Sequence, residues 1–364
     1  MRVKVRERAA AALALLLLAA AAAGGCARAS RDSRNGGGGA PGALTLEQKV
    51  GQLLLVGFEG TEVTPEIERL FREVHPGGVI LFGRNITGES QLKEFVARLQ
   101  GLSRADSGLP LFIAVDQEGG EVTRLGWLGD SVSQAQVKDP GQAYRLALAR
   151  SQGLAAAGIN LNLAPVLDMG VQGDFLTRYH RTFSGSPEKV GELAKSAIQG
   201  HRDGGLITIV KHFPGYGGIT YDPENDRLAA VSSLPEYSQF RVAAEARPDF
   251  VMTANVIYRE LDPELPFTLS PACIALLREE VEGDYLVMSD DLASKVLKES
   301  YGLGNTAVRA CRAGVDMLLV SGYEKGDVEA AFNALLEAVR SGDIASGELD
   351  ARVGGILRLK RGLK

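Results

Sequence analysis

The amino-acid sequence predicts an α/β protein with a single domain, a (β/α)8 barrel of the TIM type. Three observations support this prediction: eight short apolar runs, longer helical patterns between them, and polar residues where the runs end. Together the runs and helical patterns occupy about 320 residues, a usual length for one eight-stranded parallel barrel.

The eight apolar runs are continuous, and continuous runs indicate strands that are covered on both faces, as in parallel sheets. The stretches between them, such as residues 91–99, have apolar residues at helical spacing. An open, doubly wound sheet is the alternative, but residues 56–60 after the first run match a phosphate-binding glycine turn poorly. The expected strands lie at residues 53–58, 78–82, 109–115, 159–167, 206–210, 249–256, 285–288 and 315–320.

The first 25 residues have the pattern of a lipoprotein signal peptide. Four basic residues and one acid precede fifteen consecutive Ala and Leu residues at 9–23. That run is shorter than the about 20 apolar residues of a membrane-spanning helix and suits a signal peptide. Small residues then end at Cys26, which we expect to be lipidated. Ordinary cleavage near Gly25, with release of a soluble product, is the alternative.

Residues 26–43 contain mainly Gly, Ser, Ala, Arg and Pro without periodicity, and this composition predicts a flexible tether. The barrel domain is therefore expected to span residues 44–364. Together with the signal peptide, the tether predicts export across the inner membrane and a lipid anchor in the periplasm or cell envelope.

The charge, the cysteines and the histidines indicate which partners and bonds are not expected. The chain has a net charge of −5, and residues 44–364 carry about −10, so no nucleic-acid partner is expected. Cys273 and Cys311 lie far apart in helix-like segments, and buried free thiols are expected, with a disulfide as the alternative. The four histidines have no ligand spacing, so no metal site is predicted.

Polar and charged residues follow five of the expected strands. In a parallel barrel the carboxyl ends of the strands meet at one mouth, where the active site lies. Charged groups beside buried strands are costly unless they are paired or functional. We therefore expect an active site at this mouth, built from Asp116, Gln117, Glu118, Asp168, Lys211, His212, Asn255, Ser289, Asp290 and Asp291.

Six segments resemble successive motifs of the N-acetylglucosaminidases of glycoside hydrolase family 3. They occur in the order of the family between about residues 46 and 363. The resemblance is to the single-domain β-N-acetylglucosaminidase (β-hexosaminidase) type, because no stretch matches the second domain of many family 3 glucosidases. The segments are VDQEGG at 115–120, LAPVLD at 163–168, RTF at 181–183, KHFPG at 211–215, MTA at 252–254 and SDDL at 289–292.

The resemblance implies that Asp290 is the nucleophile. Retaining hydrolysis of a glycoside needs a carboxylate at the anomeric carbon and a proton donor at the leaving oxygen. Asp291 is the rival, but adjacent residues of a strand point to opposite sides, so only one is expected to face the mouth. We expect Asp291 to cap the amino end of the next helix.

The resemblance also implies the groups that bind the sugar. Asp116 is expected to accept hydrogen bonds from sugar hydroxyls, while Arg181, Lys211 and His212 donate. For Lys211 and His212 the alternative is a structural ion-pair cluster with Asp168. No cofactor is expected, since retaining glycosidases need none.

The chain departs from the family in the loop after the KHFPG motif. There the family has an Asp-Ser-His sequence whose Asp–His pair supplies the acid/base. Here the aspartate is Asp222, but the histidine position holds Glu224. Further differences are Tyr216 and Asn255 where the family has histidine, and Glu121 where it has arginine.

Two hypotheses follow from this loop. In the first, the protein is an exo-acting retaining β-N-acetylglucosaminidase that acts on peptidoglycan-derived or related glycans, with Glu224 or Asp222 as acid/base. Glu224 would then need a pKa raised towards neutrality by burial or by Asp222. In the second, the barrel is a catalytically impaired, membrane-tethered protein that binds a glycan without cutting it. A β-glucosidase-like activity is disfavoured, because the second domain is lacking.

Overall fold

The computed structural model describes residues 44–322 and 324–363. The expected signal peptide (residues 1–25), the tether (26–43) and the lipidation site Cys26 lie outside the described residues, so they stay predictions. None of the helices in the described ranges combines the length and the apolar character needed to cross a membrane.

Eight parallel strands form the centre of the fold. Five pair in the order β10-β1-β2-β3-β4 and three in the order β5-β7-β9. Isolated parallel bridges, Leu161 with Ile207 and Met288 with Met317, join the two groups, so pairing runs round all eight strands. The predicted (β/α)8 barrel is confirmed. The strands are β1 (Leu54–Val56), β2 (Gly78–Ile80), β3 (Phe112–Val115), β4 (Leu161–Asn162), β5 (Ile209–Phe213), β7 (Phe250–Thr253), β9 (Leu286–Ser289) and β10 (Leu318–Val320).

Each of the eight strands overlaps one predicted run, and β5 is the strand that extends furthest beyond its run. This strand ends three residues beyond the predicted 206–210, so Lys211 and His212 belong to it. Polar side chains can occupy the strand because carboxylates in the segments that follow β3 and β4 pair with them, as shown below. The short parallel pair β6 (Ala229–Val231) and β8 (Val256–Tyr258) was not predicted.

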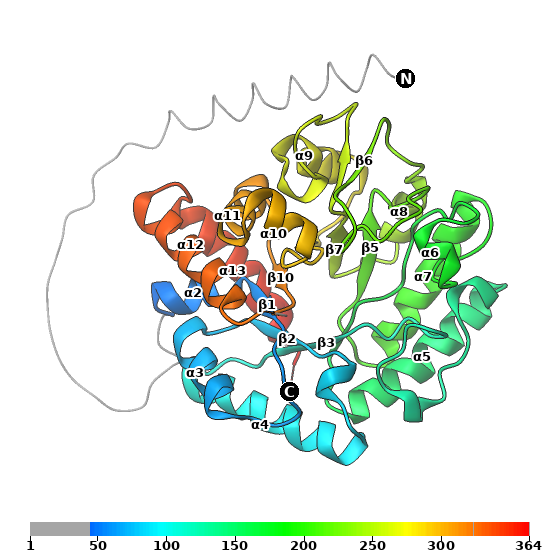
Figure 1. Cartoon of the computed structure of the whole chain (residues 1–364). Coiled ribbons are helices and arrows are strands. Elements are labelled where there is room, and N and C mark those ends of the chain that lie inside the picture. Colours follow the sequence, from blue (N-terminus) through cyan, green and yellow to red (C-terminus); the bar gives the residue numbers. More distant parts are fainter. Residues whose placement is uncertain (1–43, 323, 364) are drawn as a thin grey trace, which may run out of the picture. The chain divides into compact units, whose positions relative to one another are not determined.

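The helices surround the strands, which lie in the middle of the view in Figure 1. Four of them begin with proline directly after a Ser, Thr or Asp whose side chain accepts a backbone N–H, an arrangement that favours a helix start. The helices are α2 (Leu46–Gln52), α3 (Pro65–Val74), α4 (Glu89–Ser107), α5 (Pro140–Ala156), α6 (Phe175–Arg178), α7 (Pro187–Asp203), α8 (Ser238–Ala244), α9 (Pro271–Glu280), α10 (Lys295–Tyr301), α11 (Leu303–Ala313), α12 (Asp327–Ser341) and α13 (Ser346–Lys360), with short 3-10 turns at Gly83–Asn85, Gly126–Leu128, Gln134–Gln136 and Phe267–Leu269.

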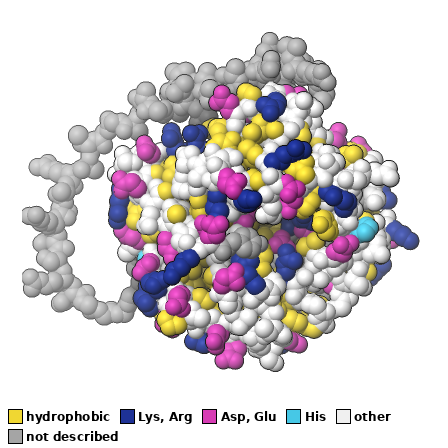
Figure 2. Space-filling view, in the orientation of Figure 1, with side chains coloured by type: hydrophobic (Ala, Val, Ile, Leu, Met, Phe, Trp, Pro, Cys, Tyr) yellow, Lys and Arg dark blue, Asp and Glu magenta, His cyan; other side chains and the backbone are white. Residues whose placement is uncertain are grey.

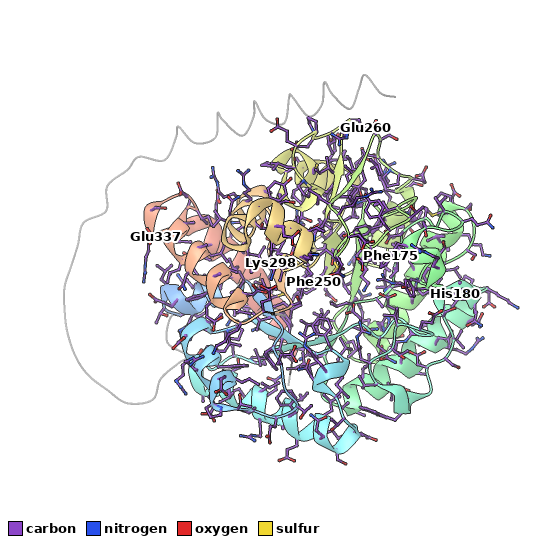
Figure 3. All side chains as sticks on the ribbon, in the orientation of Figure 1. Phe175, His180, Phe250, Glu260, Lys298 and Glu337 are labelled. Atoms are coloured by element: carbon purple, nitrogen blue, oxygen red, sulfur yellow. The ribbon has the colours of Figure 1, made fainter. Side chains whose placement is uncertain are left out.

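The amino ends of the strands are closed by apolar packing. Phe112 and Phe250, the first residues of β3 and β7, pack edge to face with their ring centroids 5.9 Å apart (Phe250 is labelled in Figure 3). Lys360 of α13 lies over the Phe112 ring and donates a 2.6 Å hydrogen bond to Gln52. The residues that the sequence predicts for the active site lie at the opposite, carboxyl end of the barrel.

The two cysteines of the barrel domain are buried and unpaired, as predicted. Burial raises the pKa of Cys273 to about 12, so this thiol stays protonated.

Candidate active site

A cavity of about 420 Å³ lies at the carboxyl ends of the barrel strands. Figure 2 shows acidic and basic side chains beside one another around the middle of the face in view. All seven residues that the sequence predicts for catalysis and sugar binding line this cavity: Asp116, Arg181, Lys211, His212, Asp222, Glu224 and Asp290.

A buried cluster of charges forms part of the cavity wall. Lys211 Nζ lies 2.8 Å from Asp116 Oδ1 and 2.8 Å from Glu118 Oε1. Arg181 donates two hydrogen bonds of 2.8 Å to the two oxygens of Glu118. Two cations and two carboxylates thus hold one another in fixed positions, which suits the recognition of several sugar hydroxyls.

The pairing in this cluster outweighs the cost of burial. Burial alone opposes ionisation of Asp116, yet Lys211 and Arg124 hold its pKa below the ordinary value. Burial likewise opposes ionisation of Glu118, and the charges of Arg181 and Lys211 keep its pKa well below the usual range. Both carboxylates are therefore ionised at neutral pH and can only accept hydrogen bonds.

Asp168, which is fully buried and lies six residues beyond the end of β4, positions His212. Its Oδ2 lies 2.9 Å from His212 Nδ1 and accepts the His212 backbone N–H, while Oδ1 accepts the Tyr216 N–H at 2.6 Å. An ionised carboxylate needs a donor, so Nδ1 carries the hydrogen and Nε2 is left for a ligand. The alternative prediction, an ion-pair cluster of Lys211 and His212 with Asp168, is therefore correct for His212 only. Lys211 pairs with Asp116 and Glu118 instead.

Asp290 follows the last residue of β9 and has both carboxylate oxygens engaged. Tyr216 donates its hydroxyl to Oδ2 at 2.6 Å, and the backbone N–H of Asp291 donates to Oδ1 at 2.8 Å. The Tyr216 hydroxyl in turn accepts the Asn255 N–H at 2.9 Å. Burial and the charge of Asp290 raise the Tyr216 pKa well above its ordinary value, so the hydroxyl stays a donor.

The expected helix-capping role of Asp291 is wrong. The N-cap residue of α10 is Ser294, and Asp291 instead accepts the backbone N–H groups of Ala293 and Ser321. The chain turns after β9, so the alternation of a strand no longer applies and Asp291 lines the cavity together with Asp290. Asp291 ties the end of β9 to that of β10, and burial raises its pKa to about 6.

Asp222 and Glu224 lie on the loop between β5 and β6. Oδ1 of Asp222 accepts the backbone N–H groups of Glu224 and Asn225, at 2.9 and 3.2 Å, so this carboxylate stabilises the turn. The Glu224 carbonyl accepts the N–H of Val296 at the start of α10, which fixes the loop against that helix.

The environment of Glu224 favours its neutral form. The surrounding protein and the negative charges of Asp290, Asp291 and Asp222 raise its pKa to about 8. The side chain is exposed to the water of the cavity, which weakens these effects but leaves the direction of the pKa shift upward. A substrate that displaces the water strengthens them.

Two residues of the site were not assigned a role from the sequence. Glu118 lies two residues after Asp116 in the same motif, and its position between two basic residues depends on contacts across the barrel. Tyr216 stands out in the sequence only as a departure from the family, and its hydrogen bond to Asp290 joins residues 74 positions apart. Phe175 and Tyr179 also line the cavity, and no sequence pattern indicates it.

Comparisons with known proteins agree with this fold. The model of the glycosyl hydrolase family 3 N-terminal domain matches residues 45–359. A β-hexosaminidase of Alkalilimnicola ehrlichii is 36% identical over 288 residues, which cover 74% of this chain and 80% of the relative. β-Hexosaminidase LpqI of Mycobacterium tuberculosis is 29% identical over 88% of this chain and 84% of its own length.

Solved structures give the same result. A family 3 β-N-acetylglucosaminidase from Paenibacillus sp. str. FPU-7 has a TM-score of 0.80 and 37% identity, over 88% of this chain and 63% of that one. The present chain therefore spans less than two thirds of the Paenibacillus protein. A β-N-acetylhexosaminidase from Beutenbergia cavernae has a TM-score of 0.78 and 28% identity, over 88% and 99% of the two chains. The chain belongs to glycoside hydrolase family 3.

Proposed function

We propose that this protein is a retaining, exo-acting β-N-acetylglucosaminidase. Its substrates are glycans that end in β-linked N-acetylglucosamine (GlcNAc), such as fragments derived from peptidoglycan. The family supports a glycoside hydrolase, and relatives named β-hexosaminidase support the sugar. The observation that carries the proposal is that Asp290 and Glu224 line one cavity, where the pKa of Glu224 is raised.

In the first step Asp290 acts as nucleophile and Glu224 as acid. The Asp290 carboxylate forms a bond to the anomeric carbon as the bond from that carbon to the leaving oxygen breaks. Protonated Glu224 gives its proton to the leaving oxygen, so the aglycone departs as an alcohol. A general acid must be protonated at the working pH, and the raised pKa of Glu224 meets this requirement.

In the second step water releases the sugar. Glu224, now ionised, takes a proton from water while the oxygen of that water bonds to the anomeric carbon and Asp290 leaves as a carboxylate. The glycosylated Asp290 is an uncharged ester, so one cause of the raised Glu224 pKa disappears in the intermediate. Glu224 therefore becomes a better base at the stage that needs one.

The buried charges beside this pair bind the sugar that is transferred. Asp116 accepts hydrogen bonds from its hydroxyls, while Lys211, Arg181 and His212 donate. Hydrogen bonds that involve an ionised group are stronger than neutral ones, and here the groups are held by their own ion pairs.

The place of action follows from the amino-terminal residues. We propose that Cys26 is lipidated and that residues 26–43 tether the barrel to a membrane of the cell envelope. A relative from Arthroderma benhamiae, 31% identical over 84% of this chain, is named a secreted glycosyl hydrolase, which supports export.

The decisive experiment compares the hydrolysis of aryl β-GlcNAc, aryl β-glucoside and aryl β-xyloside over a range of pH. We expect preferred cleavage of the GlcNAc substrate, retention of configuration in the first product, and loss of turnover in Asp290→Ala. If the wild-type protein cleaves none of the three and still binds muropeptides, it is a glycan-binding protein and the proposed hydrolysis is wrong.

A further inference from the structure

The segment between β4 and α7 presents two aromatic side chains to the cavity. Phe175 and Tyr179 line it and pack edge to face, with ring centroids 5.5 Å apart. The Tyr179 side chain is 45% exposed, which is a large fraction for an aromatic residue. In Figure 3 Phe175 lies nearer to the centre of the barrel than His180 of the same segment.

This segment is bound to the loop that carries Glu224. The Phe175 N–H donates to the Ile219 carbonyl at 2.7 Å, and the Gly218 N–H donates to Asp174 at 3.3 Å. The Arg178 guanidinium donates to the Thr220 carbonyl. Residues 218–220 lie a few positions before the acid, so the aromatic pair and the acid-bearing loop form one hydrogen-bonded unit.

The cavity therefore has two chemically different parts. The charges of Lys211, Arg181 and Asp116 suit the hydroxyls of one sugar, whereas the aromatic pair offers flat apolar faces. A third aromatic residue of the lining, Phe82, is less suitable, because the Arg84 guanidinium lies 4.3 Å from its ring centroid. The C–H groups on one face of a pyranose ring match an exposed aromatic face.

We propose that Phe175 and Tyr179 bind the leaving part of the substrate, and that this part is a second sugar ring. The inference rests on the proposed hydrolysis, since the general acid must meet the leaving oxygen. The group attached to that oxygen then lies beside the acid-bearing loop, to which the aromatic pair is hydrogen-bonded. Binding of the second ring positions the glycosidic oxygen next to Glu224.

The test compares a substrate with a second ring and one without it. The disaccharide of β-1,4-linked GlcNAc reaches the aromatic pair, whereas the fluorine atom of β-GlcNAc fluoride does not. Tyr179→Ala is expected to lower kcat/KM for the disaccharide on the order of tenfold, because part of the apolar contact is lost. The same variant should leave the fluoride unchanged, and Tyr179→Phe should leave both unchanged.

Trp127→Ala is the matched control, since Trp127 is 38% exposed and does not line the cavity. It should change neither substrate. An equal loss on both substrates in Tyr179→Ala, or no loss on either, overturns the proposal.

If the wild-type protein cleaves neither substrate, the hydrolysis is refuted and calorimetry decides the binding role. Weaker binding of the disaccharide, but not of GlcNAc, by Tyr179→Ala then supports the second-ring site. Equal affinities for the disaccharide in both proteins, or no binding to the wild type, overturn it.

Discussion

Replacing Asp290 with asparagine removes a negative charge beside Glu224 and should lower the Glu224 pKa. The surrounding protein, and then the negative charges of Asp290, Asp291 and Asp222, raise that pKa to about 8. For carboxylates about 5.5 Å apart, the separation in retaining glycosidases, Coulomb's law with an effective dielectric constant of roughly 20–40 gives about 1.5–3 kcal/mol. This energy corresponds to a fall of about 1–2 pKa units.

Carbon-13 NMR of protein labelled at the glutamate carboxyl carbon measures this shift directly. Glu224→Gln identifies the signal, and titrations of the wild type and of Asp290→Asn give the two pKa values. Glu121→Gln is the control, because Glu121 lines the same cavity but is not one of the main charges that shift the pKa of Glu224. A wild-type pKa near 4.5, or the same value in Asp290→Asn, refutes the assignment of Glu224 as the acid tuned by the nucleophile.

The hydrolytic activity is expected to fall at alkaline pH. Glu224 must be protonated in the first step, so kcat/KM falls as the pH rises through its raised pKa and is retained below that pKa. This limb is expected well above the ordinary range of a glutamate. An alkaline limb near pH 4.5 contradicts the role.

Three further changes test the site and the anchor. Glu118→Gln is expected to lower the free energy of unfolding by about 3 kcal/mol, because two buried cations lose the carboxylate that they share. Urea denaturation measures this change, and an unchanged midpoint contradicts the pairing. Tyr216→Phe removes a hydrogen bond to the charged Asp290 and should lower kcat/KM on the order of tenfold with the fold retained, whereas wild-type kinetics would show that this bond is dispensable. Cys26→Ser is expected to move the protein from the membrane fraction to the soluble fraction, and unchanged membrane association would mean another anchor.

The barrel was predictable because its signals are local. Each strand is a short apolar run, and the polar residues after the runs lie at one end of a parallel barrel whatever the side-chain pairing. The two-stranded sheet of β6 and β8 was missed because residues 229–231 are a short run whose partners lie at 256–258. The pairing of two such short strands depends on how the chain folds back on itself and not on a local sequence pattern.

The individual contacts of the site were less predictable. Lys211 was considered as a partner of Asp168, but Asp168 is occupied by His212 and by the N–H of Tyr216. Which carboxylate Lys211 meets depends on where β5 ends and on the side chains that β3 presents. The capping role expected for Asp291 failed for a similar reason, since β9 ends at Ser289 and the helix starts later than the pattern indicated.

The exchange of histidine for glutamate in the acid-bearing loop has a physical basis in this site. The ordinary pKa of glutamic acid is about 4.3 and that of histidine about 6.5. Burial and negative neighbours both raise the pKa of a carboxyl, whereas burial lowers that of an imidazole and negative neighbours raise it. The surroundings of Glu224 therefore bring a carboxyl to the neutral range in which an imidazole already titrates. The acid strength of Glu224 is then set by burial and by the charges of Asp290, Asp291 and Asp222, and the loop needs no histidine for this role.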